Sequence, residues 1–431
     1  MSKSSGLPTV VETDAFGVPV SDRPVPRITI AAFCENPETG AVIQRAALDR
    51  RLSKTHVSVH MGGAVAAAEH YSDSPTPNLI IVESRNVERA PLMAELEGLA
   101  SVCDPATKVV VVGGSNDIQL YRELIRNGIS EYLMAPLHPM QVIETIAALY
   151  AAPESEPIGK VFAFVGAKGG AGSSTIAHNF AWGLSSQLNI ASTVVDLDLP
   201  FGTAGLDFNQ DPAQGVVDAL IAPERLDDVL LDRLLVKCAE RLHLFAAPAM
   251  LDRDYDIDSG AFETVLDIVR ASSPAVVIDV PHAWTAWSRQ TLMGADEIIV
   301  TATPDLASLR NAKNIVDHFA ASRPHDARPR LILNQVGVVK RPEIPVKDFA
   351  EAIGAEPLLV LPFDPQLFGT AANNGQMIGQ LNPQSRAAQG FMHIARVLTG
   401  RESVVETKKP KRESLLKMLS SLNRKPMKKA G

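Results

Sequence analysis

The stretch VGAKGGAGSSTIAHNFAWGL, residues 165–184, carries the residue types and spacing best suited to chemistry. Its glycines let consecutive backbone N–H groups converge on one anion: Gly169, Gly170 and Gly172. Ser174 is placed to offer a hydroxyl to Mg²⁺, with Thr175 beside it. Because a predicted strand precedes the loop and a predicted helix follows it, the positive helix end adds to the anion site. The pattern predicts a phosphate-binding loop, with an ordinary glycine-rich turn as the alternative.

Acidic residues end two other predicted strands. Asp196 and Asp198 in VVDLDLPFG are two residues apart, so both lie on one face of an extended segment. Asp279 in AVVIDVPH ends a second apolar run, where an acidic residue can hold a magnesium-bound water. Taken singly, each could be a solvated carboxylate at the end of a strand. The carboxyl ends of parallel strands share one edge, so together with the loop they predict a nucleotide site there.

Apolar runs along the chain predict two successive α/β units. Four runs precede residue 150, alternating with amphipathic helical patterns: RITIAAF, NLIIVES, KVVVVGG and EYLMAPL. Seven more follow the segment APESEPIGK: KVFAFVGA, STVVDLD, LHLFAAP, AVVIDVP, EIIVTATP, RLILNQV and PLLVLPFD. Continuous apolar runs of this kind are typical of buried parallel strands. We expect an α/β protein with two doubly wound parallel-sheet domains, 27–150 and 159–400, with a flexible leader (1–26), a linker (151–158) and a tail (401–431) around them.

The composition is that of a globular protein. Hydrophobic residues make up 46% and charged residues 21% of the 431 residues, which argues against collagen, coiled coil or global disorder. Three scattered cysteines are too few for a disulfide framework, and the ten histidines show no HExxH spacing. No run approaches the ~20 apolar residues of a membrane span. We expect a soluble, cytoplasmic protein with no metal site beyond Mg²⁺.

The charge is unevenly distributed. The tail, residues 401–431, holds ten Lys/Arg and three Glu, so its charge of +7 within a total of −8 leaves −15 for the rest. An acidic body disfavours a broad nucleic-acid face, and we expect no specific nucleic acid as a partner. Apolar tail residues fall at helical spacing between basic clusters: Leu415, Leu416, Met418, Leu419 and Leu422. Two interpretations of the tail stay open, a solvated chain or a basic amphipathic helix on anionic lipid or a partner.

With these motifs, residues 159–400 resemble the MinD/ParA class of ATPases, whose deviant phosphate loop follows K-G-G-x-G-K-[ST]-[ST]. Lys168 matches the early lysine that reaches the phosphates of the other subunit in that class. Ser173 stands where the class carries its loop lysine. The resemblance implies ATP and Mg²⁺ as cofactors, with Ser174 as a metal ligand and Asp279 acting through water. It also implies a catalytic role for Lys168 and for Asp198, our candidate for orienting the attacking water.

The same resemblance implies further nucleotide contacts. It matches Asp196 and Asp198 to the first switch region and Asp279 to the second. Asn334 in LILNQVG matches the asparagine that recognises adenine, although a strand-end asparagine in a turn is the alternative. Pro362 and Asp364 in LPFDP match a segment that lines the base pocket. The implied nucleotide-binding loop comprises Lys168, Gly169, Gly170, Ala171, Gly172, Ser173, Ser174 and Thr175.

Longer segments are similar to the CpaE/TadZ proteins of Tad (Flp) pilus assembly. They include GVVDALIAPERLDDVLLDRLL, ERLHLFAAPAMLD and LPFDPQLFGTAANNGQMIGQLNPQSRAAQGF. That family joins a receiver-like domain to a MinD-like ATPase domain. The resemblance covers roughly residues 27–400 and implies placement of pilus and secretion machinery at a particular site, such as a cell pole, beside the inner membrane.

The first domain departs from a phosphorylatable receiver. Glu83 stands where such a domain carries its acceptor aspartate, and a glutamate carboxylate lies one methylene further out. Ala135 precedes Pro136 in place of the lysine that pairs with the phosphoryl group. We therefore expect no phosphorelay, and a pseudo-receiver that serves docking or dimerisation.

These features predict an ATP-binding localisation factor for Tad (Flp) pilus biogenesis that acts as a homodimer with weak or no hydrolysis. Its partners would be pilus or secretion assembly components and, through the tail, the inner-membrane surface. Two alternatives stay open. One is a cycling ParA/MinD-type ATPase that positions DNA or a division complex, and the other is a pseudo-receiver signalling adaptor. Ser173 distinguishes the localisation factor from the cycling ATPase, because cycling ATPases keep the lysine at this position.

Overall fold

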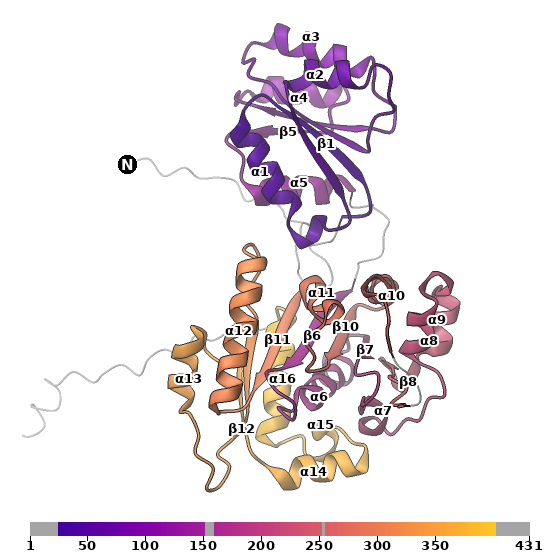
Figure 1. The fold of residues 1–431 in the computed structure, drawn as a ribbon, viewed down its shortest axis with the longest axis vertical. Coiled ribbons are helices and arrows are strands. Elements are labelled where there is room, and N and C mark those ends of the chain that lie inside the picture. The colour runs from indigo at the N-terminus through magenta and orange to yellow at the C-terminus, as the bar shows by residue number, and fades with distance from the viewer. Residues whose placement is uncertain (1–24, 151–158, 252–254, 402–431) are drawn as a thin grey trace, which may run out of the picture.

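Two sheets, each covered by helices on both faces, organise the protein (Figure 1). The structure, a computed structural model, describes residues 25–150, 159–251 and 255–401. This arrangement confirms the predicted α/β class with two doubly wound sheets. The linker and almost all of the leader and tail lie outside the described residues, so those expected segments stay predictions.

The first sheet has five parallel strands in the order β2-β1-β3-β4-β5. Their bounds are β1 Thr29–Cys34, β2 His56–Met61, β3 Leu79–Glu83, β4 Lys108–Gly113 and β5 Glu131–Met134. The helices between them are α1 Pro37–Ala47, η2 Arg50–Leu52, α2 Gly63–His70, α3 Arg89–Ala100, α4 Ile118–Arg126 and α5 Pro139–Tyr150. Alternate residues of each strand enter opposite cores, one under α1 and α5 and the other under α2, α3 and α4.

The second sheet has eight strands in the order β13-β12-β11-β6-β10-β7-β9-β8. Their bounds are β6 Lys160–Gly166, β7 Ser192–Asp196, β8 Val236–Ala239, β9 Leu242–Phe245, β10 Ala275–Val280, β11 Glu297–Ala302, β12 Arg330–Val336 and β13 Leu359–Pro362. All neighbours run parallel except the pair β8 and β9.

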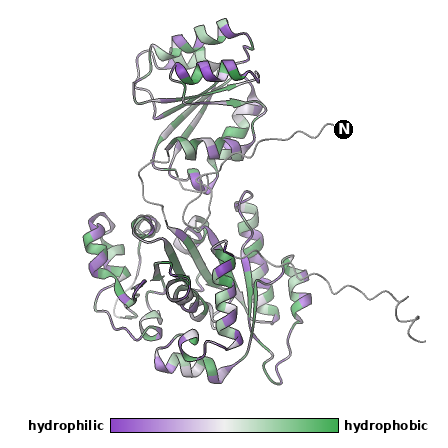
Figure 2. Cartoon of the chain, turned by 180° about the vertical axis from the view of Figure 1, so that it is seen from behind, coloured by the Kyte–Doolittle hydropathy of each residue, from purple (hydrophilic) through white to green (hydrophobic). Residues whose placement is uncertain are grey.

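Helices on both faces bury this sheet. One face carries α6 Ser173–Ser186, α7 Ala204–Asp207, α14 Pro365–Asn374, α15 Ile378–Leu381 and α16 Arg386–Leu398. The other carries α8 Val216–Ile221, α9 Asp228–Leu234, α10 Ser259–Ser272, α11 Ala286–Gly294, α12 Leu306–Ser322 and α13 Val346–Ile353, with η3 Pro223–Arg225 after α8. The strands of both sheets are predominantly apolar (Figure 2), as expected for parallel strands buried on two faces.

Two strands have no counterpart in the predicted runs. β2 and β8 are both terminal strands of their sheets, paired on one side only. β2 reads HVSVHM and is half-exposed, and β8 has only four residues. Because an edge strand is partly solvated, polar residues interrupt its apolar pattern, and sequence periodicity becomes a weak guide.

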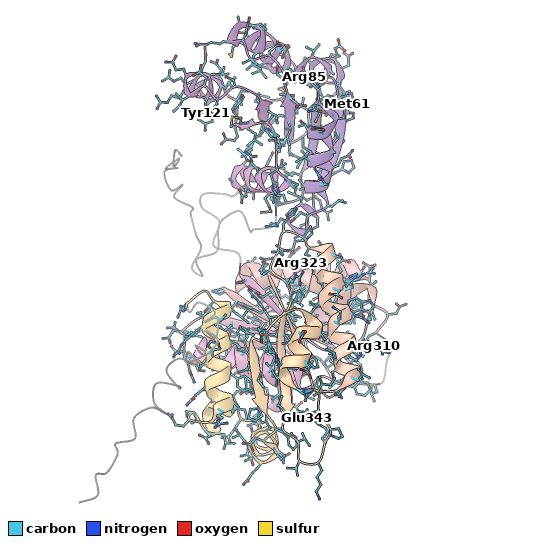
Figure 3. All side chains as sticks on the ribbon, turned by 90° about the vertical axis from the view of Figure 1, so that its left-hand side faces the viewer. Met61, Arg85, Tyr121, Arg310, Arg323 and Glu343 are labelled. Carbon is cyan, nitrogen blue, oxygen red and sulfur yellow. The ribbon has the colours of Figure 1, made fainter. Side chains whose placement is uncertain are left out.

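The two units meet at a buried network of ion pairs. Arg50 donates to Asp326 Oδ2 at 2.7 Å and to Asp296 Oδ1 at 3.1 Å, with 8% of its side chain exposed. Arg323 donates to the same Asp326 at 2.7 Å and lies at the junction in Figure 3. Lys54 forms a further ion pair with Asp267.

The junction lies at the amino ends of both sets of strands. Arg50 precedes β2, and Asp296 and Asp326 precede β11 and β12. The carboxyl ends of the two sheets therefore face away from each other. Met61 lies at the far end of the first unit and Glu343 at the opposite end of the second (Figure 3).

Candidate nucleotide-binding site

The phosphate loop, residues 167–172, connects the central strand β6 to α6. Gly170 and Gly172 have φ of 76° and 87°, a left-handed conformation that only glycine adopts without strain. Ala171 donates its N–H to the Lys168 carbonyl at 3.3 Å, which closes a tight turn. The first backbone N–H groups of α6 have no partner within the helix and point toward the loop. The local geometry is that of an anion cradle at a helix amino end.

Lys168 is held by an acidic residue of its own chain. Its Nζ lies 2.6 Å from Oδ2 of Asp305, the residue that caps the amino end of α12. Burial alone would raise the pKa of Asp305, but hydrogen bonds from Lys168 and Thr303 lower it to about 2. The pair is partly exposed, with 37% of the lysine and 31% of the aspartate side chain accessible. Lys168 is thus paired and lies at the surface of the loop.

Two serines follow the loop with different surroundings. Ser173 is 9% exposed, and its Oγ has no hydrogen-bond partner among the described residues. A buried hydroxyl without a partner is costly, so this position favours a ligand with a hydrogen-bonding oxygen. Ser174 donates to Asp279, a bond that lowers the pKa of that carboxyl. Thr175, on the same turn, accepts a hydrogen bond from Asn179 through its carbonyl at 2.9 Å.

Two of the predicted carboxylates, Asp196 and Asp279, are close together and buried, at 1% and 3% exposure. They end the adjacent strands β7 and β10, where the two residues are register partners. Burial, followed by the charge of Asp279, raises the pKa of Asp196 to about 7, although His178 opposes the shift. Burial likewise raises the pKa of Asp279, against the charge of His178 and the Ser174 bond. A cation or further hydrogen-bond donors beside the two carboxylates would favour their charged forms.

Asp198 lies in the cleft beside this pair. Its N–H donates to Asp196 at 3.0 Å, and its Oδ1 accepts from Phe201 N–H at 3.3 Å. Burial raises the pKa of Asp198. It is the most accessible of the three predicted carboxylates, as a residue that contacts a reacting water must be.

Asn334 contacts the phosphate loop rather than an open pocket. Its Nδ2 donates to the Ala171 carbonyl at 2.8 Å, and its Oδ1 accepts from Gln335 N–H at 2.8 Å. A Cβ at Gly172 would run into this amide, so the asparagine and the glycine form one packed unit. The adenine-binding role of Asn334 stays a prediction.

The LPFDP segment ends β13 next to β12. Pro362 is exposed, and Asp364 caps α14 by accepting from Leu367 N–H at 3.0 Å. The cap accounts for Asp364 as a helix-starting residue, and contact of this segment with a base stays a prediction.

A cleft of about 920 Å³ brings most of the predicted residues together. Lys168 to Thr175 line it with Asp198. Asn334, Pro362 and Asp364 do not line it, nor do the buried Asp196 and Asp279. It also contains residues that the sequence patterns did not single out: His282, Tyr255, Phe201 and Leu251. His282 Nδ1 lies 2.8 Å from the Gly166 carbonyl at the start of the loop. A histidine three residues after Asp279 was the available signal, but only the fold brings it to Gly166.

These residues fit a Mg²⁺-bound nucleotide. The loop supplies backbone donors, Ser173 an unpaired hydroxyl, and Ser174 a hydroxyl beside Asp279. No group of three or more His, Cys, Asp or Glu in the described ranges is arranged to hold a metal ion. A metal here would therefore need ligands from the nucleotide itself, as Mg²⁺ does in phosphate-transfer sites.

The carboxyl end of the first sheet is built differently. Glu83 is 5% exposed, and its carboxylate accepts from the N–H groups of Glu35 and Asn36, at 2.8 and 2.7 Å, and from the Thr39 hydroxyl at 2.7 Å. Every one of these donors belongs to the start of α1 or the turn before it. Glu83 thus serves as an internal clamp on that turn, which supports the expectation that it accepts no phosphoryl group.

Comparison with known proteins supports the assignment of the second unit. The chain is 25% identical over 251 residues, 56% of its length, to 90% of the septum site-determining protein MinD of Synechocystis. A ParA family ATPase from Chlorobium tepidum superposes with a TM-score of 0.51 at 27% identity, covering 56% of this chain and 98% of that one. This is the MinD/ParA-like fold of P-loop NTPases. This fold agrees with the second sheet described above, which has eight strands and a phosphate loop after its central strand β6.

A second similarity concerns a shorter part of the chain. The pilus assembly protein CpaE from Caulobacter crescentus is 54% identical over 30% of this chain and 98% of that structure, with a TM-score of 0.29. No family model matches the sequence. Among the described residues, no helix has the length and apolar character needed to cross a membrane.

Proposed function

We propose that this protein is an ATP-binding localisation and assembly factor of Tad (Flp) pilus biogenesis, which forms an ATP-dependent homodimer and hydrolyses ATP slowly or not at all. The observation that carries the proposal is the loop itself, with Ser173 in the place of the lysine and Lys168 kept at the surface. The comparison with MinD and ParA proteins supports a nucleotide-binding ATPase fold. The CpaE similarity, judged on its sequence identity, favours the pilus assignment within that class.

The loop favours binding over hydrolysis. A lysine about 4 Å from a phosphate contributes roughly 4 kcal/mol before desolvation at an effective dielectric near 20. Ser173 cannot supply this charge, but the backbone donors, the helix end and the Ser174 hydroxyl remain. Hydrolysis needs additional charge stabilisation at the transferred phosphoryl group, so the missing lysine weakens the transition state more than the bound state. ATP then acts mainly as a ligand that joins two subunits.

Dimerisation would supply the missing charge. Lys168 lies at the exposed side of the loop, where a facing subunit could receive it once its pair with Asp305 opens. Apolar side chains line the same cleft, with Phe201 67% and Leu251 70% exposed. An exposed apolar rim around a polar centre is typical of a protein-binding surface. Binding of ATP and of the second subunit would be coupled and reciprocal.

Localisation completes the proposal. The +7 tail would contact anionic lipid or a partner at the inner membrane, at about 1 kcal/mol per basic residue near such a surface. The tail lies outside the described residues, so this part depends on sequence alone. The first unit would dock a pilus component, with its carboxyl edge facing away from the ATPase unit.

Purified protein tests the function directly. We expect Mg²⁺-dependent binding of ATP in calorimetry, a dimer with ATP in light scattering, and turnover well below ~1 per minute with DNA or lipid present. Absence of nucleotide binding would contradict the proposal and favour the signalling adaptor. Turnover stimulated by DNA or lipid would favour the cycling ATPase instead.

A further inference from the structure

His178 is a buried titratable residue that the proposed nucleotide site does not use. It lies on α6, one helical turn after Ser174, and its side chain has no exposed surface. Its Nδ1 lies 2.7 Å from Oδ2 of Asp207, and its Nε2 lies 3.7 Å from Oδ2 of Asp279. The Nε2 atom has no hydrogen-bond partner in the described part of the chain. A fully buried ring nitrogen without a partner is costly, so a small movement that brings it to Asp279 would stabilise it.

The two carboxylates that flank the ring belong to different parts of the site. Asp207 ends α7, the short helix after the first switch segment, and Ala204 at its start donates its N–H to Asp196 at 3.2 Å. Asp279 belongs to the second switch and accepts the Ser174 hydroxyl. One imidazole thus connects the helix that follows the phosphate loop to both switch regions.

Charge explains why a histidine suits this position. Asp196, Asp207 and Asp279 all act on the ring, and Phe208 packs against it with ring centroids 5.4 Å apart. Carboxylates at low exposure need a cation or hydrogen-bond donors nearby. Because the two ring nitrogens face opposite sides of the imidazole, one side chain can contact Asp207 through Nδ1 and Asp279 through Nε2.

The Ser174 hydroxyl has two competing acceptors. Without a ligand it donates to Asp279, and in the proposed function it is the hydroxyl that turns to a Mg²⁺-bound nucleotide. Asp279 then loses one hydrogen bond while the unpaired His178 Nε2 lies 3.7 Å away. A movement of under about 1 Å brings the two atoms into hydrogen-bond distance.

We propose that His178 is a positioning residue that transmits nucleotide binding to α7, holding Asp207 through Nδ1 and taking over Asp279 through Nε2 when Ser174 leaves it. The inference rests on the proposed function, because it needs the nucleotide to engage Ser174. The expected consequence is that α7 and the surface around it become more rigid when the nucleotide binds. Phe201 lies just before α7 and Leu206 lies in it, and their side chains are 67% and 72% exposed. With nucleotide bound, both would be presented to a second copy of this chain.

Hydrogen–deuterium exchange with a non-hydrolysable ATP analogue tests the link. In the wild type, Mg²⁺ with the analogue should slow exchange of amides 203–208 by at least about tenfold over the analogue with EDTA. His178→Phe, which keeps the ring volume, should bind the analogue but show less than half of that protection. Asp207→Asn, which keeps a polar side chain, should lose it in the same way. His318→Phe is the matched control, because His318 Nε2 also lacks a partner but lies on α12, and it should behave as the wild type.

Nitrogen NMR of histidine-labelled protein supplies a readout that a merely structural role would not move. The His178 Nε2 signal should shift on addition of Mg²⁺ with the analogue and stay unchanged with EDTA. If the wild type binds the analogue but this signal and the α7 amides do not respond, the inference is wrong and the proposed function stands. If the wild type binds no nucleotide, the proposed function fails first. Should His178→Phe not fold, Asp207→Asn and the wild-type spectra decide the question.

Discussion

At the scale of single residues, the candidate nucleotide site is distinguished by the positions of its positively charged side chains. The phosphate loop lacks a lysine at Ser173, and the remaining Lys168 is paired with Asp305 at 2.6 Å. A partly exposed pair of this kind is weak, so a phosphate can displace the carboxylate. In the proposed function, a nucleotide would break this pair and free Lys168 to contact a phosphate.

Opposite effects are expected from changing the two members of this pair. Lys168→Ala should abolish ATP-dependent dimers, because no other cation on the loop can reach a facing phosphate. Asp305→Asn should strengthen dimerisation by a few-fold, since it frees the lysine while an asparagine still caps α12. Light scattering at increasing ATP measures both. Ser173→Ala is the control and should change little, and normal ATP-dependent dimers of Lys168→Ala would refute the role of this lysine.

The raised pKa of Asp196 predicts that the stability of the fold depends on pH. Its pKa of about 7 in the folded protein exceeds the ordinary value of 3.8, so the folded state binds more protons than the unfolded state between these values. Stability from this group is therefore lost as pH rises from about 4 to 7. The raised pKa of His178 acts in the same direction above pH 6.5.

Thermal denaturation of Asp196→Asn measures this contribution. Between pH 5.5 and 8, the melting temperature should fall less for the variant than for the wild type, because the asparagine keeps hydrogen bonding without titrating. Groups with lowered pKa, such as Asp326, act equally on both proteins and cancel in the comparison. Parallel curves for the two proteins would show that Asp196 does not titrate in this range.

At the scale of elements, the loop between β6 and α6 depends on two glycines with positive φ. Gly172 is the more constrained, because a side chain there would also meet the Asn334 amide that holds Ala171. Loop conformation and the end of β12 are thus coupled by packing. No sequence motif shows this coupling, since the two segments are far apart in the chain.

Gly172→Ala should lower nucleotide affinity more than Gly169→Ala. The left-handed conformation costs an alanine about 1–2 kcal/mol, and displacement of Asn334 adds to it. Gly169 lies in open space and outside the left-handed region, so its substitution should cost well under 1 kcal/mol. Calorimetric titration of both variants with Mg²⁺ and ATP compares them. Equal losses would mean that the φ of Gly172 does not shape the site.

At the scale of the whole molecule, the two sheets are joined by their amino ends. The buried Arg50 contacts two aspartates of the second unit, and Arg323 and Arg270 share these partners. Burial would raise the pKa of Asp326, but Arg50 and Arg323 lower it to about 2. The network leaves both carboxyl ends free, so the proposed partner surface and the candidate nucleotide site lie at opposite ends.

Arg50→Ala should separate the two units. It leaves Asp296 and Asp326 buried with fewer partners, at a cost of about 3–5 kcal/mol for a broken buried pair. Exchange of amides around residues 50–54 and 323–326 should increase, and heat should melt the units in two transitions. Arg89→Ala, which removes an exposed pair with Glu123 in the first unit, is the control and should leave the unfolding transition nearly unchanged. A single unchanged transition in Arg50→Ala would show that the units are held by other contacts.

The linear pattern of residues was sufficient for the class of fold and for naming most of the residues that gather at the candidate site. Buried parallel strands are continuous apolar runs, and loop glycines and strand-end carboxylates keep fixed spacings, so β6, the phosphate loop, Asp196, Asp198 and Asp279 could all be predicted from local order. The edge strands β2 and β8 could not, because solvation dilutes their pattern.

The pairing of distant residues required the tertiary structure. Lys168 with Asp305, Asn334 with Ala171, and Arg50 with Asp296 are separated by 137, 163 and 246 positions. In the sequence, His178 is only one position of a helical pattern. The fold brings Asp207 of α7 and Asp279 of β10 to its two ring nitrogens. Sequence spacing reports which residues share an element, whereas contact between elements depends on how whole faces pack, and that packing is what placed each charge beside its partner.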